Sequence, residues 1–374
     1  MKMEKAACAR IEEAIAQFTV EGCLLERHPY GNGHINDTFL LIYEMPEGVK
    51  KQYILQRMNH EIFKKPHQLM ENIVNVTEYL REMIISQGGE PDRETLNVIK
   101  TRNDENYYQD GSGNYWSMFL FIERTVCLEK VESAKDFYDS AVAFGNFQRM
   151  LADYRAEKLH ETIPNFHHTP SRFRDFQRAA HEDKLGRAAS VKAEIEFALA
   201  REKDTSVLTD LLAARQLPLR VTHNDTKLNN ILFDEDSRKA LCIIDLDTVM
   251  PGLSHYDFGD SIRFGASTGE EDEKDLSKIE LDLSLFEAFT KGYLEGCGGR
   301  LTDKEIEMLP MGAKLMTYEC GIRFLADYLE GDTYFKIHRE GHNLDRARTQ
   351  FKLVADMEAK WDAMQAVVEK YRNG

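Results

Sequence analysis

Residues 218–251 constrain the fold more than any other part of the chain, because short apolar runs lie there beside many polar side chains. The runs at 219–222, 230–233 and 241–246 are rich in β-branched residues, which is typical of strands. The turn sequence Asp-Glu-Asp-Ser-Arg at 234–238 separates the last two runs and predicts a β-hairpin. The sequence on either side has mostly helical periodicity, so we expect this hairpin to interrupt a helix-rich region.

The first third of the chain predicts a small α+β lobe over residues 1–122. Two segments have apolar residues at helical spacing, and four others are short alternating or continuous apolar runs. The predicted helices are 4–18 and 69–83, and the predicted strands are 30–43, 51–58, 96–101 and 115–122. The strands 30–43 and 51–58 are expected to pair as a hairpin.

The remainder of the chain, residues 123–374, predicts a larger helical lobe that carries the hairpin. Apolar residues recur at helical spacing in 136–154, 171–180, 194–199, 208–215, 283–292, 306–329 and 345–371. A length of 374 residues is enough for two lobes. The predicted class is α+β, with a small β-rich N-terminal lobe and a large helical C-terminal lobe.

Composition and charge narrow the kinds of ligand. The chain is 42% apolar and 30% charged, as globular proteins are, and its net charge of −16 has the wrong sign for holding nucleic acid through phosphates. The cysteines form no C-x-x-C pair, which argues against structural zinc, and no segment fits an export signal or a membrane span. We expect a cytoplasmic enzyme without a nucleic-acid or membrane partner.

Side chains that can carry chemistry are concentrated around the hairpin. Asp225, Asn230 and Asp245 can be brought around one point, since Asp245 follows the second hairpin strand. Asp225 offers the proton acceptor that a hydroxyl needs while it is phosphorylated, and the other two offer the oxygen ligands that Mg²⁺ prefers. A polar turn is the alternative, but burying several unpaired polar groups without a function is costly. The set indicates a phosphoryl transferase; the role of Asp247, as metal ligand or as support for the ligands, is open.

The order of these motifs resembles the aminoglycoside phosphotransferase and choline kinase group of the protein-kinase-like fold, which has a glycine loop, H-x-D-x4-N and I-D in this order. Longer stretches look like the N-acetylhexosamine 1-kinase family: residues 30–36, 219–232, 244–248, 257–267 and 319–331. The resemblance implies a two-lobed fold and Mg²⁺-dependent transfer of phosphate from ATP to the anomeric hydroxyl of N-acetylglucosamine or N-acetylgalactosamine. It also implies Asp225 as the base, with Asn230 and Asp245 as metal ligands.

The glycine loop is expected to bind the phosphates of ATP. Gly31 and Gly33 let backbone N–H groups approach a triphosphate, and His34 and Asn36 add further donors. The resemblance leaves a second place open for His34, near the transferred phosphoryl group or the sugar. An ordinary turn is the alternative for the whole motif.

Gln56 stands at the strand position where most relatives of this fold place a Lys or Arg that holds phosphates. Alternation puts Arg57 on the opposite face of the strand, so Arg57 is not an automatic substitute. Phe121 and Glu123 look like the connection between the lobes, where backbone groups would receive adenine. The expected nucleotide site is therefore completed by Gln56, Phe121 and Glu123. Without a Lys or Arg at position 56, Mg²⁺ and loop amides are expected to neutralise more of the phosphate charge.

The acceptor site is expected around Arg323. By the resemblance, Arg323 binds sugar hydroxyls, and Phe264 and Tyr334 cover the apolar sugar face or the acetamido methyl group. The spacing alone allows another interpretation, because Glu319 and Asp327 stand four residues before and after Arg323 and predict a surface ion-pair ladder.

Asp257-Phe-Gly259 spells the metal-binding triplet of protein kinases, but it lies outside the hairpin. We therefore expect Asp257 to bond the backbone near Asp225, or His223, and prefer Asp245 as the metal ligand. Buried carboxylates commonly accept hydrogen bonds from backbone N–H groups.

Two other functions stay open at the level of sequence. One is a kinase of the same fold that acts on another small alcohol, such as choline, homoserine or an aminoglycoside. The other is a nucleotide-binding pseudokinase, which Gln56 suggests and the complete set of Asp225, Asn230 and Asp245 disfavours. Oligomeric state and the choice between sugar epimers are open.

Overall fold

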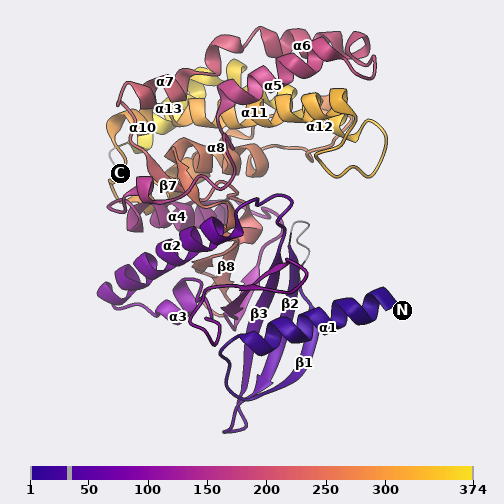
Figure 1. Cartoon of the computed structure of the whole chain (residues 1–374). Helices are drawn as coiled ribbons and strands as arrows, with labels where there is room; N and C mark the ends of the chain where they lie inside the picture. The colour runs from indigo at the N-terminus through magenta and orange to yellow at the C-terminus, as the bar shows by residue number, and fades with distance from the viewer. Residues whose placement is uncertain (1, 32–35, 373–374) are drawn as a thin grey trace. The chain divides into compact units, whose positions relative to one another are not determined.

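The computed structural model describes residues 2–31 and 36–372 (Figure 1). The chain divides into two compact units. Unit 1 comprises Met1–Val126, Lys158–Ile163 and Leu232–Val249, and unit 2 comprises Cys127–Glu157, Pro164–Ile231 and Met250–Gly374. Two later segments thus belong with the N-terminal region, and the expected lobe boundary after residue 122 stays a prediction.

Unit 1 contains an antiparallel sheet with the strand order β1-β2-β3-β5-β4. The strands are β1 (Cys23–Pro29), β2 (Asp37–Glu44), β3 (Lys50–Met58), β4 (Tyr108–Gln109) and β5 (Tyr115–Leu120). The predicted hairpin is confirmed, since β2 and β3 pair from Asp37 opposite Arg57 to Glu44 opposite Lys50. The strand predicted at 96–101 is wrong, because this segment forms only isolated bridges, such as Val98 with Phe119.

Helices of unit 1 follow from their apolar spacing. In α1 (Lys2–Gln17), Ala14 and Ile15 pack with Phe18 against sheet residues that include Leu41 and Leu55. In α2 (Pro66–Ser86), a proline occupies the first turn, where its missing N–H costs nothing. The buried stripe of α2 is Leu69, Ile73, Val76, Leu80 and Ile84. The short α3 (Pro91–Glu94) follows.

The predicted hairpin of residues 230–246 is confirmed as β8 (Ile231–Asp234) and β9 (Ala240–Ile243), in a sheet of order β6-β8-β9 with β6 (Thr125–Cys127). Its turn is closed by the Asp234 N–H, which donates to the carbonyl of Lys239 at 2.9 Å. In unit 2, β7 (Arg220–Thr222) pairs antiparallel with β10 (Met250–Gly252).

Unit 2 is mostly helical, as predicted. Its helices are α4 (Ala134–Met150), α5 (Thr169–Glu182), α6 (Lys192–Leu199), α7 (Val207–Ala213), α8 (Ser254–Gly265), α9 (Leu283–Cys297), α10 (Asp303–Glu307), α11 (Leu309–Glu330), α12 (His342–Ala359) and α13 (Trp361–Tyr371). The predicted helix 306–329 is divided at Met308, where Pro310 opens α11, and 345–371 is divided at Lys360. The sequence prediction missed α8.

Short 3₁₀ turns connect many of these elements. They are η1 (Ala156–Lys158), η2 (Ala188–Val191), η3 (Glu202–Asp204), η4 (Leu228–Asn230), η5 (Leu246–Thr248) and η6 (Leu276–Lys278). Two of them adjoin residues of the predicted active site, because η4 ends at Asn230 and η5 is preceded by Asp245.

The core of unit 2 surrounds α11, which is buried over most of its length. Phe173 and Phe176 of α5 and Phe351 of α12 pack with α11 residues such as Ile322 in one apolar cluster. This packing fixes α11, the helix that carries Arg323. Within the part of the chain that the structure describes, no helix is long and apolar enough to cross a membrane.

Candidate active site

Asp225 lies in the loop of residues 223–230, which follows β7, and its side chain is held by two neighbours in that loop. The Nζ of Lys227 is 2.7 Å from Asp225 Oδ1. The Nδ2 of Asn230 donates to Asp225 Oδ2 at 3.1 Å and to its backbone carbonyl at 2.8 Å. Each carboxylate oxygen therefore has a donor, which orients the group while 26% of the side chain stays exposed. The predicted pair Asp225 and Asn230 is brought together.

Lys227 is a site residue that the sequence analysis did not assign. Burial acts to lower the pKa of Lys227, but the charge of Asp225 and the hydrogen bond to it outweigh burial and raise the pKa. Lys227 is therefore a cation beside the proposed base. The signal was present in the sequence, since a lysine two residues after the aspartate of this loop is within reach of its carboxylate.

The loop is anchored on α8 through Asp257. The Asp257 carboxylate accepts the backbone N–H of His223 at 3.0 Å and of Asn224 at 2.8 Å, and the Nε2 of Gln148 at 3.0 Å. The hydroxyl of Thr226 donates to the carbonyl of Asp257 at 2.7 Å. The prediction that Asp257 bonds the backbone near Asp225 is confirmed.

The orientation of Asn230 suits a metal ligand. Its Nδ2 is used by Asp225, so Oδ1 is the oxygen that the amide has left to offer. A neutral oxygen of this kind is a usual ligand for Mg²⁺.

The second predicted metal ligand, Asp245, belongs to unit 1 and lies beside Asp247. Asp245 is exposed and has a left-handed backbone with φ 59°. Asp247 is buried, and its Oδ2 accepts a hydrogen bond from Asn36 Nδ2 at 2.5 Å. Burial, and then the charge of Asp245, raises the pKa of Asp247.

Two mutually repelling carboxylates form a donor set that a divalent cation would stabilise, so Asp245 and Asp247 fit a hard metal ion. Among residues 2–31 and 36–372, no cluster of three or more His, Cys, Asp or Glu side chains forms a metal site. That Asn230 and Asp245 bind the same ion stays a prediction.

The expected phosphate loop is described only at its ends. Gly33 and His34 lie outside the described residues, and Gly31 has φ 76°, which glycine adopts without strain. Both polar atoms of the Asn36 side chain form hydrogen bonds: Oδ1 accepts the backbone N–H of Asn59 at 2.9 Å, and Nδ2 donates to Asp247. Its role as a phosphate donor stays a prediction.

Gln56 of β3 lies opposite Thr38 and Ser117, and its side chain forms no hydrogen bond within the described residues. Arg57 is engaged elsewhere, since its Nε donates to Asp37 at 2.7 Å, so the expectation that Arg57 does not replace a phosphate-binding Lys agrees with its contacts. The phosphate role of Gln56 itself stays a prediction.

Phe121 and Glu123 follow β5 in the expected adenine-binding segment. The Phe121 ring meets Tyr30 edge to face at 5.7 Å, and its N–H donates to the carbonyl of Gln52 at 3.1 Å. The Glu123 carbonyl accepts from Arg93 at 3.3 Å. Adenine binding by this segment stays a prediction.

Arg323 lies in a pocket of about 140 Å³ within unit 2. The pocket is lined by Arg172, Asp175, Arg178, Arg323, Ala326, Asp327, Glu330, Tyr334 and Phe335. The guanidinium of Arg323 lies 5.5 Å from the centre of the Phe166 ring, 6.0 Å from Tyr334 and 5.5 Å from Phe335. The structure therefore brings Arg323 and Tyr334 together.

The alternative ion-pair ladder is wrong, because both expected carboxylates are used elsewhere. Glu319 is fully buried and bonds His167 at 2.9 Å and Thr169 at 2.8 Å. Asp327 accepts backbone N–H groups of residues 333–335 at 2.8 to 2.9 Å. Among the described residues Arg323 has no ion pair, which leaves its N–H groups available to a ligand.

Arg172, which the sequence analysis did not assign, is one of three arginines that line this pocket. Its Nε and Nη2 donate to the Phe166 carbonyl at 3.2 and 3.1 Å. Burial, followed by the charge of Arg323, lowers the pKa of Arg172 from its usual range. Phe264, the third expected acceptor residue, is 42% exposed on α8 and does not line the pocket.

Comparison with known proteins places these features in a family context. The model of the phosphotransferase enzyme family (APH) matches residues 26–281. The structure of a microcompartment-associated aminopropanol kinase is similar, with a TM-score of 0.62 and 16% identity over 96% of this chain and 98% of that chain.

Two further solved structures are similar over nearly the same span. An aminoglycoside phosphotransferase from Alicyclobacillus acidocaldarius has a TM-score of 0.59 and 13% identity, covering 96% of each chain. Amicoumacin kinase in complex with AMP-PNP, Ca²⁺ and Ami has a TM-score of 0.58 and 11% identity, again covering 96% of each chain. At these identities the likeness shows the fold, and it confirms the predicted aminoglycoside phosphotransferase-like, protein-kinase-like architecture.

Proposed function

Because the chain belongs to the phosphotransferase enzyme family, whose model matches residues 26–281, we propose that this small-molecule kinase phosphorylates the anomeric hydroxyl of an N-acetylhexosamine. The proposed products are the sugar 1-phosphate and ADP. The phosphate donor is ATP, used with Mg²⁺. A divalent cation and an ATP analogue in the similar amicoumacin kinase support this pairing.

The observation that carries the acceptor class is that two guanidinium groups of the pocket, those of Arg172 and Arg323, form no ion pair within the described residues. Arg172 bonds a carbonyl oxygen instead. Two carboxylates of the pocket, Asp175 and Glu330, pair with Arg178, at 2.9 and 3.9 Å. Asp327 is surrounded by backbone N–H groups. Guanidinium groups donate forked hydrogen bonds to hydroxyl and carbonyl oxygens, and they repel ammonium groups. The pocket therefore favours a neutral sugar over a cationic alcohol.

In the proposed reaction, Asp225 accepts the proton of the anomeric hydroxyl as the sugar oxygen bonds the γ-phosphorus of ATP. The bond between that phosphorus and the β,γ-bridging oxygen breaks, and its electrons leave with ADP. Lys227 and Asn230 hold the Asp225 carboxylate for this transfer, at 2.7 and 3.1 Å. Asn230 and Asp245 would hold Mg²⁺, with Asp247 supporting Asp245; the ion supplies positive charge to the phosphate oxygens.

The decisive experiment is a panel of acceptors incubated with Mg-ATP, with ADP release and ³¹P NMR of the product as readouts. The panel contains N-acetylglucosamine, N-acetylgalactosamine, glucose, galactose, choline, ethanolamine, homoserine and an aminoglycoside. We expect an anomeric phosphate on an N-acetylhexosamine. Phosphate on O6, or turnover of cationic alcohols alone, would contradict the proposal.

Asp225→Asn supplies the control for chemistry. Loss of a general base typically costs about 10²–10⁴-fold in rate, so kcat should fall by at least about 100-fold. Nucleotide affinity, measured by calorimetry, should stay the same because the substitution is isosteric. Normal turnover in this variant would exclude Asp225 as the base. If the wild type released no more sugar-dependent ADP than this variant, a pseudokinase would be favoured.

Asp245→Asn tests the metal site. We expect the Mg²⁺ concentration that gives half-maximal activity to rise by about 10-fold or more, since a carboxylate ligand is lost. Asp236→Asn is the matched control, because Asp236 is an exposed carboxylate in the turn of the same hairpin and pairs with Arg124. An unchanged Mg²⁺ dependence in Asp245→Asn would exclude this residue as a ligand.

A further inference from the structure

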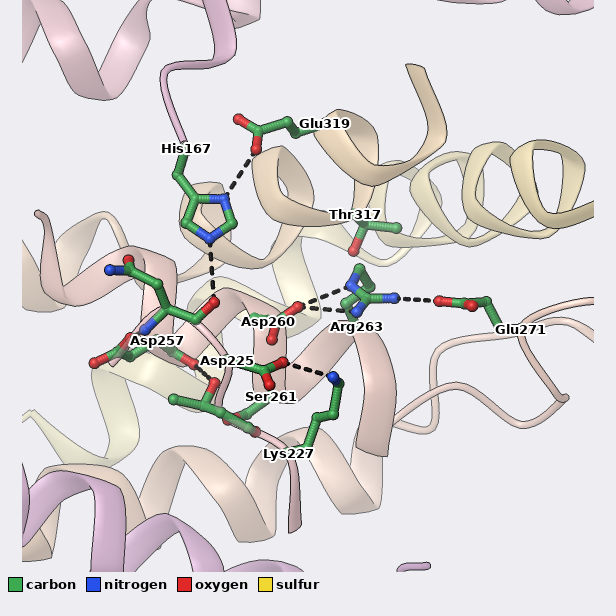
Figure 2. Close-up of polar contacts among 12 residues, drawn as sticks. His167, Asp225, Lys227, Asp257, Asp260, Ser261, Arg263, Glu271, Thr317 and Glu319 are labelled. Atoms are coloured by element: carbon green, nitrogen blue, oxygen red, sulfur yellow. Dashed lines mark hydrogen bonds and ion pairs between the residues drawn. The ribbon is translucent and has the colours of Figure 1, made fainter. Parts of the chain in front are cut away.

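His167 links the loop that carries Asp225 to helix α11. Figure 2 shows its imidazole between the Glu319 carboxylate and the backbone ahead of Asp225. The Nδ1 atom lies 2.9 Å from Glu319 Oε1, and the Nε2 atom lies 3.4 Å from the carbonyl oxygen of Asn224. His167 is 8% exposed and Glu319 is 0% exposed, so water does not compete for these contacts.

Both ring nitrogens of His167 face acceptors. The carbonyl of Asn224 can only accept, and Glu319 is a carboxylate, since the hydrogen bond and charge of His167 outweigh burial and lower the pKa of Glu319. The second oxygen of Glu319 receives the hydroxyl of Thr169 at 2.8 Å. The imidazole is therefore held between two fixed oxygen atoms, and its contact with Glu319 orients the ring toward the loop.

Asn224 is the residue that the contact of His167 with the loop restrains. Its φ is 65°, in the left-handed region, and its N–H donates to Asp257 Oδ1 at 2.8 Å. Its carbonyl, on the other side of the Cα atom, accepts from His167. Side chains from two different segments of the chain therefore fix the peptide groups on both sides of Asn224, which is followed directly by Asp225.

We propose that His167, oriented by Glu319, is a positioning residue that holds the carboxylate of Asp225 in place for proton transfer. This inference rests on the proposed function, in which Asp225 is the base. Neither His167 nor Glu319 has to touch a substrate for it to hold.

The same segment also reaches the acceptor pocket. Phe166, the residue before His167, has its ring 5.5 Å from the Arg323 guanidinium, and its carbonyl accepts from Arg172 at 3.1 Å. Arg323 and Glu319 lie one helical turn apart on α11. Two consecutive residues thus contact the loop that carries Asp225 and two arginines that line the pocket, so a displaced His167 affects both.

The test compares His167→Gln and Glu319→Gln with the wild type on whichever acceptor the wild type turns over. We expect kcat to fall by about 10- to 100-fold in each, the scale of a misplaced catalytic group, with the KM for ATP within about two-fold of wild type. The double variant should lose no more than about the larger single loss, because the two residues act as one unit.

His342→Gln is the matched control. His342 is also a buried histidine that meets a carboxylate, Asp272, through Nε2 at 3.1 Å and a backbone N–H, of His338, through Nδ1 at 3.2 Å. It should lose thermal stability as His167→Gln does, but keep its kcat per folded molecule. A normal kcat in His167→Gln, or an equal loss in His342→Gln, would overturn the proposal.

Hydrogen exchange separates this proposal from the acceptor assignment. In His167→Gln, but not in His342→Gln, the amides of His223 and Asn224 should exchange about 10-fold faster or more, since their loop opens more often. This result does not depend on the acceptor. Turnover of an alcohol other than an N-acetylhexosamine would defeat the proposed function alone, whereas unchanged exchange in His167→Gln would defeat the positioning role alone.

Discussion

Asn224 and Asp245 show how single residues carry strain beside the proposed reaction centre. Both have left-handed backbones, with φ of 65° and 59°. Asn and Asp enter this region more readily than most residues, yet such a conformation still costs about 1–3 kcal/mol. Contacts from Asp257 and His167 offset that cost at Asn224. The strain is therefore retained where it aims the next side chain, Asp225.

Arg323→Gln tests a residue whose charge has no ion-pair partner within the described residues. The variant should keep its stability to within about 1 kcal/mol, because only contacts of the guanidinium with aromatic rings are lost. Its KM for the acceptor should rise by about 10-fold or more, the effect of removing a hydrogen bond to a ligand by a charged group. Steady-state kinetics with varied sugar and thermal unfolding measure the two effects.

Arg201→Gln serves as the control, because Arg201, unlike Arg323, forms an ion pair within the protein. Arg201 forms a bidentate ion pair with Glu358, at 3.0 and 2.6 Å. Its loss should lower the melting temperature and leave the KM for the acceptor unchanged. If Arg323→Gln instead lost stability and kept its KM, the assignment of Arg323 to the acceptor would be wrong.

At the scale of elements, the contact between α4 and α9 depends on glycines. A Cβ atom on Gly296 of α9 would lie 2.4 Å from the carbonyl oxygen of Val142, and one on Gly145 of α4 would lie 2.4 Å from the carbonyl oxygen of Tyr293. Side chains at these positions would force the helices apart. The close approach therefore requires residues without a Cβ atom at both positions.

Gly296→Ala should destabilise the protein by about 1–3 kcal/mol through overpacking. In an unconstrained helix the same change would stabilise by about 1 kcal/mol, so the sign of the effect identifies the contact. Gly111→Ala is the control, because a Cβ atom on Gly111 would have no neighbour within 4 Å among the described residues. Urea unfolding measures both, and a Gly296→Ala variant as stable as wild type would refute the close-packing argument.

Helix boundaries show the limits of periodicity at this scale. One apolar pattern spans 306–329, but the chain forms α10 and α11, because the first turn of α11 begins at Leu309 with Pro310. The pattern at 96–101 predicted a strand, yet only scattered backbone bonds join it to β5, such as Ile99 N–H to Met118 at 2.8 Å. Periodicity identifies a buried face and does not determine whether the backbone stays regular.

At the scale of the whole molecule, buried ionisable groups of unit 2 link its stability to pH, and Glu305 and Asp260 are buried carboxylates that pair with arginines. Glu305 with Arg220 is an example, with Oε1 2.9 Å from Nε and Oε2 2.7 Å from Nη2. Burial acts to raise the pKa of Glu305, but Arg220 outweighs it and lowers the pKa below 4.5. His255 is buried without charge, and burial lowers its pKa to about 4.

Both shifts predict acid sensitivity. A carboxylate with a lowered pKa stabilises the fold above the pKa of the unfolded chain, and this stability is lost as pH falls. A histidine with a lowered pKa acts in the same direction between pH 6.5 and about 4. The contribution of His255 to the free energy of unfolding in urea should therefore fall below about pH 6.5, and that of Glu305 below about pH 5, whereas the raised pKa of Asp247 acts in the opposite direction.

Glu305→Gln tests whether the pair of Glu305 with Arg220 causes the loss of stability below about pH 5. It should be less stable than wild type at pH 7, because Arg220 loses its partner, and its stability should depend less on pH below about pH 5. A Glu305→Gln variant whose stability depends on pH below about pH 5 as strongly as that of the wild type would contradict the linkage argument.

The sequence by itself determined the family, the α+β class and the pairing of Asp225 with Asn230, because motif order, periodicity and spacing within one short loop are local properties. Only the tertiary structure decided the partners that lie far apart along the chain. Glu319 bonds His167 instead of Arg323, and Asn36 bonds Asp247, 211 residues away. Helical spacing shows which neighbours a side chain can reach, but packing brings other donors closer, and a buried carboxylate binds the donors that share its burial.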